Sequence, residues 1–184
     1  DAVGSFGINI LGGFYAVRSP DWNGTAGAYT IASSATGIAG TVGAGNSLVG
    51  AAAGDFVGAN SAQSLFTGRY ALVSEMNGFG AVTVFDPASA PAGVVSAANS
   101  LIGDNAGDEI GSGGLQFLGS SIWAVFSPVY DGGGSTDNGA VSFLDGSNGH
   151  FAGTGTGFAG NVSAANSLVG TSDGAQVGSN GIDF

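Results

Sequence analysis

Two short strings in the chain have the spacing of catalytic motifs. "GTSDG", Gly170 to Gly174, fits the Gly-x-Ser-x-Gly pattern that exposes a serine nucleophile on a strand-to-helix turn. "GTGFAG", Gly155 to Gly160, fits the Gly-x-Gly-x-x-Gly pattern of dinucleotide-binding loops. Neither string opens a helix, and the counterparts of "GTSDG" at Gly50 and Gly103 contain no serine. We therefore expect neither string to form a functional site.

The single histidine, His150, lies near Asp145, and these two residue types belong to a Ser-His-Asp triad. His150 falls in a glycine-rich insertion, residues 146–160, whose composition favours a solvated loop or an extended hairpin. One histidine with scattered carboxylates is also a poor zinc site. We predict a protein that is not an enzyme and has no metal centre and no cofactor, and the alternative is a surface calcium ion between Asp131 and Asp137.

Three loops are better candidates for binding, because each combines an acid with a bulky side chain. They read "PDWNG" from Pro20, "EMNG" from Glu75 and "PVYDG" from Pro128. An aromatic ring can stack on a pyranose while neighbouring carboxylates and amides bind its hydroxyl groups. The predicted ligand-binding residues are Asp21, Trp22, Asn23, Glu75, Asn77, Tyr130 and Asp131.

The alternative for these loops is structural. Trp22, Met76 and Tyr130 occupy corresponding places, and all three could fill the apolar space between adjacent repeating units. Met76 in particular counts against a sugar site repeated in every unit.

The loops belong to an internal repeat. An opening marker recurs as "DAVGS" at Asp1, "DFVGA" at Asp55, "DEIGS" at Asp108 and "AQVGS" at Ala175, with spacings of 54, 53 and 67 residues. Periods of this size indicate propellers or stacked arrays. We predict three repeats, 1–54, 55–107 and 108–174, the last lengthened by the insertion, and the first strand of a fourth repeat over 175–184.

Two further markers place strands inside each repeat. They are the runs "YAV", "YAL" and "WAV" from Tyr15, Tyr70 and Trp123, and the runs "GAYTI", "GAVTVF" and "GAVSFL" that follow them. With one strand after the opening marker and one leading into "NSLVG", each repeat is predicted to hold four short antiparallel strands. Ala16, Ala71 and Ala124 occupy one equivalent position, where a small residue would let strands pack closely.

The composition supports an all-β fold. Gly accounts for 37 of 184 residues, which disfavours helices, and valine, threonine and aromatic residues occur in short runs between turn-forming residues. Charged residues make up only 8% of the chain against 43% hydrophobic ones, so the chain should fold.

The charge excludes several classes of partner. The formal net charge is −11 and the only cations are Arg18 and Arg69, so no basic patch for nucleic acid or anionic lipid can form. No apolar stretch approaches the roughly 18 residues needed to span a bilayer. The chain has no cysteine and starts at Asp1, and we interpret it as a mature product or an excerpt.

The repeat resembles a known family. "GDFVGANSAQSLFTGRYALVSE" from Gly54, with "GAVTVF" after it, resembles the FG-GAP type of β-propeller blade, and "NSLVGTSDGAQVG" from Asn166 is similar to that family's linker between blades. "SAANSLVG" and "YAVRSPDWNG" also resemble repeats of very large secreted bacterial adhesins of the haemagglutinin type. The resemblance covers essentially the whole chain and implies four-stranded propeller blades in tandem, with a β-solenoid or stacked-sheet array as the alternative.

The chain departs from that family at one place. Calcium-binding members carry an Asp-x-Asp-x-Asp-Gly loop before the second strand, whereas the corresponding turns here read "LGGF", "FTGR" and "LGSS". Calcium needs six or more oxygen ligands, so that site should be absent.

From the resemblance we expect a non-enzymatic, extracellular or cell-surface module with a structural or adhesive role. One alternative is a lectin-like propeller that binds a glycan through the loop residues. The other is a self-assembling fibre subunit, because an unpaired strand at Gln176 to Phe184 could join another chain and give a homo-oligomer through edge strands.

Overall fold

A computed structural model describes residues 1–182, and it is all-β apart from two single-turn 3-10 helices. The predicted fold class is confirmed at this level. The strands are β1 (Ile8–Leu11), β2 (Phe14–Ser19), β3 (Ala28–Ser33), β4 (Leu48–Val49), β5 (Gln63–Ser64), β6 (Tyr70–Ser74), β7 (Ala81–Phe85), β8 (Gly93–Val94), β9 (Leu101–Ile102), β10 (Leu115–Gly119), β11 (Ile122–Ser127), β12 (Ala140–Asp145), β13 (His150–Phe151), β14 (Gly160–Asn161) and β15 (Ser167–Val169). The 3-10 helices are η1 (Met76–Gly78) and η2 (Pro87–Ser89).

The strands form three five-stranded sheets, one for each repeat, with no closed barrel among the described residues. The first two sheets run in the orders β1-β2-β3-β4-β8 and β5-β6-β7-β9-β14, and the third runs β10-β11-β12-β13, with β15 also paired to β12. Four strands of each of the first two sheets are antiparallel and come from one repeat. The fifth comes from the next repeat and is parallel: β8 pairs with β4, and β14 pairs with β9.

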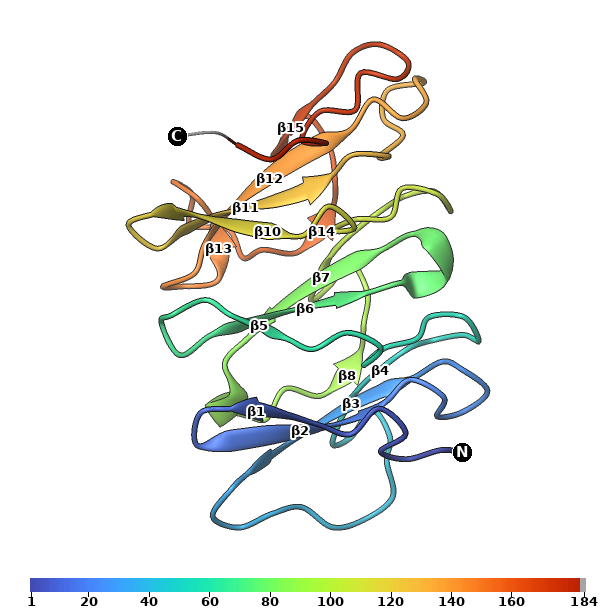
Figure 1. Cartoon of the computed structure of the whole chain (residues 1–184), viewed down its shortest axis with the longest axis vertical. Coiled ribbons are helices and arrows are strands. Elements are labelled where there is room, and N and C mark those ends of the chain that lie inside the picture. The colour runs from blue at the N-terminus through green and yellow to red at the C-terminus, as the bar shows by residue number, and fades with distance from the viewer. Residues whose placement is uncertain (183–184) are drawn as a thin grey trace.

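The sheets lie one above another along the longest axis, from the first repeat at the bottom of Figure 1 to the third at the top. The middle sheet is covered on both sides. Leu72 and Phe85 point down into a core shared with the first sheet, whereas Ala71 and Val82 point up into a core shared with the third. Strands buried on both faces read as continuous apolar runs, which explains "YALV" and "AVTVF" in the sequence.

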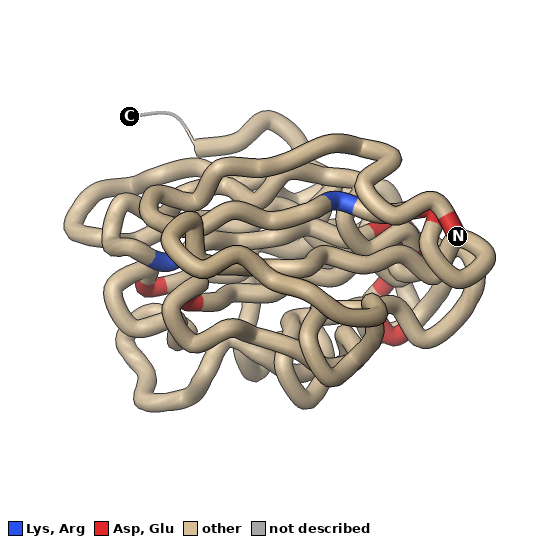
Figure 2. Tube along the Cα trace, turned by 90° about the horizontal axis from the view of Figure 1, so that it is seen from below, with Lys and Arg blue, Asp and Glu red and all other residues tan. Residues whose placement is uncertain are grey.

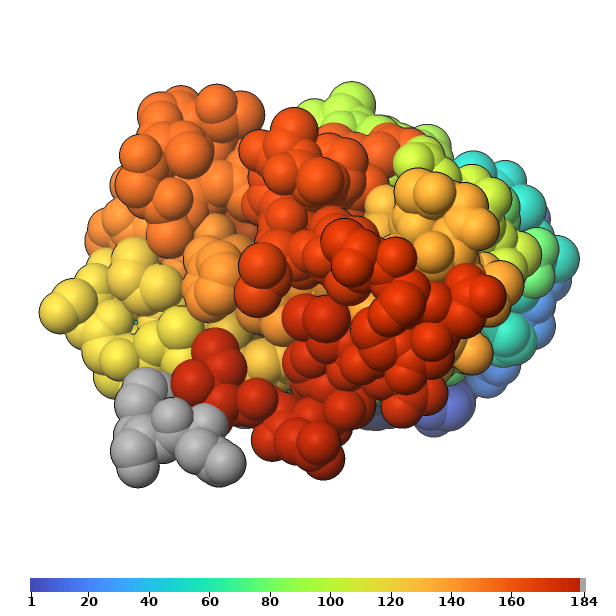
Figure 3. Space-filling view, turned by 90° about the horizontal axis from the view of Figure 1, so that it is seen from above, coloured from blue at the N-terminus to red at the C-terminus, as the bar shows by residue number. Residues whose placement is uncertain are grey.

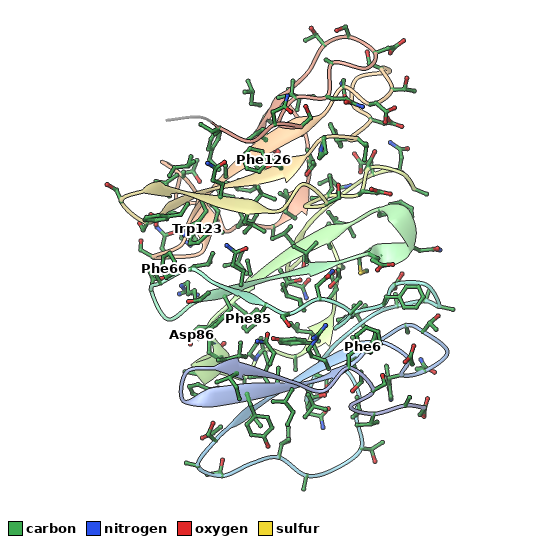
Figure 4. The ribbon with its side chains drawn as sticks, in the orientation of Figure 1. Phe6, Phe66, Phe85, Asp86, Trp123 and Phe126 are labelled. Atoms are coloured by element: carbon green, nitrogen blue, oxygen red, sulfur yellow. The ribbon has the colours of Figure 1, made fainter. Side chains whose placement is uncertain are left out.

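The small residue expected in the middle of each sheet is buried in all three repeats. Ala16, Ala71 and Ala124 are each no more than 1% exposed, and each lies on the upper face of its own sheet. Larger side chains close the edges of the stack. Phe66, from the turn between β5 and β6, packs against Trp123 of the sheet above with ring centroids 5.4 Å apart (Figure 4).

The repeated "NS" of "NSLVG" is a hydrogen-bonding clamp. The Asn99 side chain accepts the Ser96 N–H at 3.0 Å and donates to the Val94 carbonyl at 3.0 Å, which closes the loop that leads into β9. The Ser100 hydroxyl bonds Asn99 and, at 2.7 Å, the buried hydroxyl of Thr83 on β7. The same bonds recur in the other repeats, at Asn46, Ser47 and Thr30 and at Asn166, Ser167 and Ser142.

A glycine marks each place where one repeat meets the next. Gly80 has φ +68°, and a Cβ there would lie well under 3.0 Å from the backbone nitrogen of Ile110 in the following repeat. Gly27 stands in the same relation to Val57, and Gly139 to Val177. We call Gly27, Gly80 and Gly139 the junction glycines. No residue with a side chain could adopt this φ without strain while leaving the backbones in contact.

An aspartate follows each of the first two junctions. The Asp55 carboxylate accepts the N–H groups of Ala51 and Ala52 at 2.7 and 2.9 Å, and Asp108 makes the matching pair of bonds to Asp104 and Asn105. These bonds hold the turn that carries the chain from one repeat to the next. At the third junction the equivalent residue is Ala175, which cannot make them.

Residues 175–182 lie across the upper end of the stack (Figure 3). Val177 packs on the third sheet, and the Gln116 side chain bonds both the N–H and the carbonyl of Ile182, at 3.0 and 2.8 Å. These residues form no strand, and the end of the predicted strand, 183–184, lies outside the described residues. The described part of the segment therefore covers the third sheet and is not a free edge.

The junction glycines give a first prediction. Gly80→Ala should lower the free energy of unfolding by more than about 3 kcal/mol, because the methyl group meets backbone as well as an unfavourable φ. Gly68→Ala is the matched control: its φ is +84° but its Cβ would meet open space, so it should cost about 1 to 2 kcal/mol. Chemical denaturation measures both. Equal losses would show that close approach at Gly80 is unimportant.

The clamp gives a second prediction. Asn99→Ala removes side-chain bonds to two backbone groups and one hydroxyl, so unfolding should become easier by about 2 kcal/mol. Asn105 is exposed, and it is its backbone N–H that donates to the Asp108 carboxylate. Asn105→Ala should therefore change stability by less than about 0.5 kcal/mol. The same denaturation curves compare the two variants, and a neutral Asn99→Ala would mean that the clamp does not hold the loop.

Candidate functional site

The three loops predicted to bind a ligand lie along one edge of the stack. Each follows the second long strand of its repeat, after β2, β6 and β11, and Figure 1 shows the loops one above another at the right-hand edge. The repeat therefore does place these loops on a common side of the molecule.

In the first repeat the loop residues are open to solvent. Asp21 and Asn23 are exposed, and the indole of Trp22 is half-buried. Asn23 has a positive φ of 50°, and its backbone N–H donates to the carboxylate of Asp1 at 2.9 Å.

In the second repeat the loop folds back onto the first. Glu75 and Asn77 are exposed, whereas Met76 between them is buried in the core shared by the first two sheets. The N–H groups of Met76 and Asn77 donate to the carbonyls of Asp55 and Gly54, at 3.1 and 3.0 Å. This loop therefore secures the junction between the first two repeats.

In the third repeat the aromatic residue is a core residue. Tyr130 is 5% exposed, packs between the second and third sheets, and donates its hydroxyl to the Val162 carbonyl at 2.8 Å. Burial raises the pKa of the Tyr130 phenol above its usual value, and the nearby carboxylates of Asp108 and Asp104 act in the same direction. Asp131 is half-buried: its N–H donates to Asp108, and its carboxylate accepts the Asp137 N–H.

The structure does not bring Trp22 and Tyr130 together. They belong to the first and third repeats, with the second sheet between them, and the ring of Tyr130 offers no free face for stacking. In the second and third repeats the bulky residue fills the space between sheets, which is the structural alternative for these loops. Trp22 occupies the same repeat position in the first repeat, and among residues 1–182 no other sheet precedes the first one.

Asn77 lines a groove of about 470 Å³ and Tyr130 one of about 380 Å³, and a third groove gathers polar groups from two repeats. It has a volume of about 310 Å³, and Glu75 lines it together with Glu109 from the next repeat. Asn60 and Ser74 lie in the same groove, and the Ser74 hydroxyl is buried and has no hydrogen-bond partner among residues 1–182. Carboxylate, amide and hydroxyl groups around one groove can bind the hydroxyl groups of a sugar. Sequence reasoning missed Glu109 and Asn60, because they reach the groove from a different part of the repeat pattern.

The few charges are spread along the trace, as Figure 2 shows. Arg18, one of the two arginines, donates to the carbonyls of Gly58 and Ala59 in the second repeat and lies over the ring of Phe6. One of the two cations is therefore used in holding repeats together, which leaves the loop edge with an acidic character.

The candidate catalytic residues are not assembled into a triad. Asp145 and His150 are cross-strand partners on β12 and β13, but the Asp145 carboxylate accepts from Ser121, Ser147 and Asn148. These hydrogen bonds hold the pKa of Asp145 below its usual value. Within residues 1–182 no hydrogen bond joins the His150 ring to Asp145 or to Ser172.

The insertion 146–160 has a structural use. Phe151 and Phe158, with ring centroids 4.6 Å apart, are both buried in the core between the second and third sheets. His150 pairs with Gly157 across the insertion, which is therefore a short hairpin, one of the two forms that its composition predicts.

The described residues, 1–182, hold neither a metal-binding cluster nor a membrane-spanning helix. No group of three or more histidine or acidic side chains is arranged to hold a metal ion. No helix has the length and apolar character to cross a membrane.

Comparison with known proteins gives one match. The model of a family described as a repeat of unknown function, DUF5650, matches residues 10–59, 73–112 and 118–179. No curated protein and no solved structure matches the chain. Each matched segment begins in one of the three predicted repeats and ends five residues past that repeat's predicted boundary, and the repetition itself is confirmed.

The burial of Tyr130 gives a third prediction. Because the folded-state pKa is raised, only the unfolded chain loses this proton as the pH rises past about 10, so stability should fall there. Tyr130→Phe should make that fall shallower, and at pH 7 it should cost about 1 kcal/mol by removing the bond to Val162. Denaturation at pH 7 and above pH 10 measures both effects. Tyr15→Phe, at a half-buried position, is the control, and an unchanged alkaline slope in Tyr130→Phe would contradict the assignment.

Proposed function

The chain belongs to the DUF5650 family of repeats, and from this premise we propose that it is a non-enzymatic structural module of an extracellular or cell-surface protein. Its task is to stack β-sheets into a stable, acidic spacer or adhesive arm. The finer form of this proposal is a set of propeller-type blades, and the alternative is an open array of stacked sheets.

The observation that carries the proposal is where the repeated residues are used. The small residue of the second long strand is buried within the sheet stack, the "NS" pair clamps a loop, and the junction glycines admit the backbone of the next repeat. The residues that recur in every repeat therefore serve to pack one sheet on another. What varies is the loop edge, where Trp22, Met76 and Tyr130 replace each other.

The composition agrees with a role outside the cell. A net charge of −11 favours solubility, and with no lysine and two arginines the chain offers few sites for trypsin-like proteases.

A second candidate function rests on the groove between Glu75 and Glu109. Its carboxylates, the buried Ser74 hydroxyl and the Asn60 amide suit a lectin-like site for a neutral glycan. In this case the stack would be the support and the groove the functional surface.

A glycan array separates the two functions. The structural module should bind no glycan above background, and Glu109→Gln and Trp22→Ala should leave that result unchanged. Binding of one glycan class that Glu109→Gln abolishes would contradict a purely structural role and support the lectin. If Trp22→Ala alone abolished binding, the site would lie on the loop of the first repeat.

A further inference from the structure

The lower end of the stack exposes apolar residues whose equivalents are buried elsewhere. Val3 is 57% exposed, but Val57, at the same repeat position, is completely buried against the first sheet. Ile8 is 62% exposed, whereas its equivalent Ala62 is 9% exposed. The residues at the beginning of the first repeat thus form a surface that the other repeats use to pack on the sheet below.

The backbone at this end is also unpaired. Phe56 and Glu109 have φ values of 46° and 43°, and the N–H of Phe56 donates to the Thr25 carbonyl of the preceding repeat at 3.0 Å. Ala2 is their equivalent, but it has no positive φ, and within residues 1–182 its N–H has no partner. The first repeat therefore has the residues that form a junction in the other repeats, but within residues 1–182 these residues do not make the junction contacts.

The upper end has the complementary feature. Leu168 on β15 is 59% exposed, whereas its equivalents Leu48 and Leu101 are buried. Those two pack in the cores that their sheets share with the following sheet, and β8 and β14, from the following repeat, pair in parallel beside them. The third sheet has no such strand beside β15 among the described residues.

The missing strand has an equivalent in the first repeat. Gly93 of β8 and Gly160 of β14 have φ values of 129° and 117°, and Gly40 has the same conformation, with φ 122°. Gly40 and Thr41 form no strand in the isolated chain, and both are exposed. They already have the backbone shape that the other repeats use to join the sheet below.

We propose that the lower end of one copy stacks on the upper end of a second copy, with residues 40–41 pairing in parallel with β15. This inference rests on the proposed structural function, because it continues the internal stacking across two chains. The internal pairs Leu48 with Gly93 and Leu101 with Gly160 fix the register, which places Gly40 beside Leu168. Residues 1–8 of the incoming copy then lie over the Gly139 junction of the other.

That junction is occupied by residues 175–182, so one segment replaces the other. The two read "DAVGSFGI" and "AQVGSNGI", and they share the valine, the glycines and the final isoleucine. Asp1 takes the position of Ala175, where it can accept the N–H groups of Thr171 and Ser172 as Asp55 accepts those of Ala51 and Ala52. Residues 1–8 of the incoming copy therefore accept two hydrogen bonds that residues 175–182 cannot accept.

This contact joins two different surfaces, so each copy keeps one free upper end and one free lower end. Such a heterologous contact extends into a filament unless its rotation closes a ring. A contact between two lower ends would instead stop at a dimer.

Light scattering on the full chain across a range of concentrations tests the proposal. The mass of the wild-type protein should rise with concentration above the 17.6 kDa of one chain. Ile8→Asp and Leu168→Asp each place a charge in the contact at an exposed position, and each should weaken association at least about tenfold. Val94→Asp, at a 42% exposed position in the middle of the stack, is the matched control and should associate as the wild type does.

Mixing the variants tests the direction of stacking. Ile8→Asp keeps an intact upper end and Leu168→Asp an intact lower end, so an equimolar mixture should give dimers and nothing larger. Dimers in Leu168→Asp alone, with none in Ile8→Asp, would mean a lower-to-lower contact and would overturn the proposal.

A third variant tests the exchange of segments. Ala175→Asp gives residues 175–182 a carboxylate that can accept the same two hydrogen bonds. These residues should then be harder to displace, so this variant should associate less than the wild type. Stronger association in Ala175→Asp would overturn the exchange. A wild-type chain that stays monomeric would overturn the stacking of copies, yet a blank glycan array would still leave the structural role of the single chain standing.

Discussion

The stack depends on one steric constraint, which is that the backbone of each repeat crosses a glycine of the repeat before it. At Gly27, Gly80 and Gly139 there is no room for a Cβ, because the next repeat's backbone occupies that space. The close approach lets Val57, Ile110 and Val177 donate their N–H groups to the preceding repeat. A larger residue would push the sheets apart, and the apolar cores between them would lose their contacts.

Two other repeated features support these junctions. The asparagine clamps shape the loops that lead into β4, β9 and β15, and the parallel strands β8 and β14 extend one repeat into the sheet of the previous one. Each of the first two sheets is thus completed by the following repeat, so either of these repeats on its own would lack a strand. This interdependence favours a protein whose function lies in the assembly itself, and it leaves the first and last repeats with unmatched surfaces.

Part of this architecture could be predicted, because the repeats are recognisable in the amino-acid sequence. The all-β class, the three repeats and the buried alanines followed from spacing and composition. The parallel strands did not, since a two-residue strand such as β8 has no periodicity to detect. The burial of Tyr130 could not be predicted for a different reason: Tyr130 and Trp22 share a repeat position, but only Tyr130 has a sheet beneath it, and burial by a neighbouring repeat is a tertiary effect. Glu109 approaches Glu75 only because two repeats meet.

Hydrogen exchange at the backbone amides of Val57 and Ile110 tests the central claim most directly. Both donate across a junction, at 3.2 and 3.1 Å, to the repeat before them. If the junctions hold the sheets together, these amides should exchange only when the whole chain unfolds, with the same free energy as the amides of β6 and β7. Exchange through a local opening of much lower free energy would show that the sheets separate while each stays folded, and it would contradict the account.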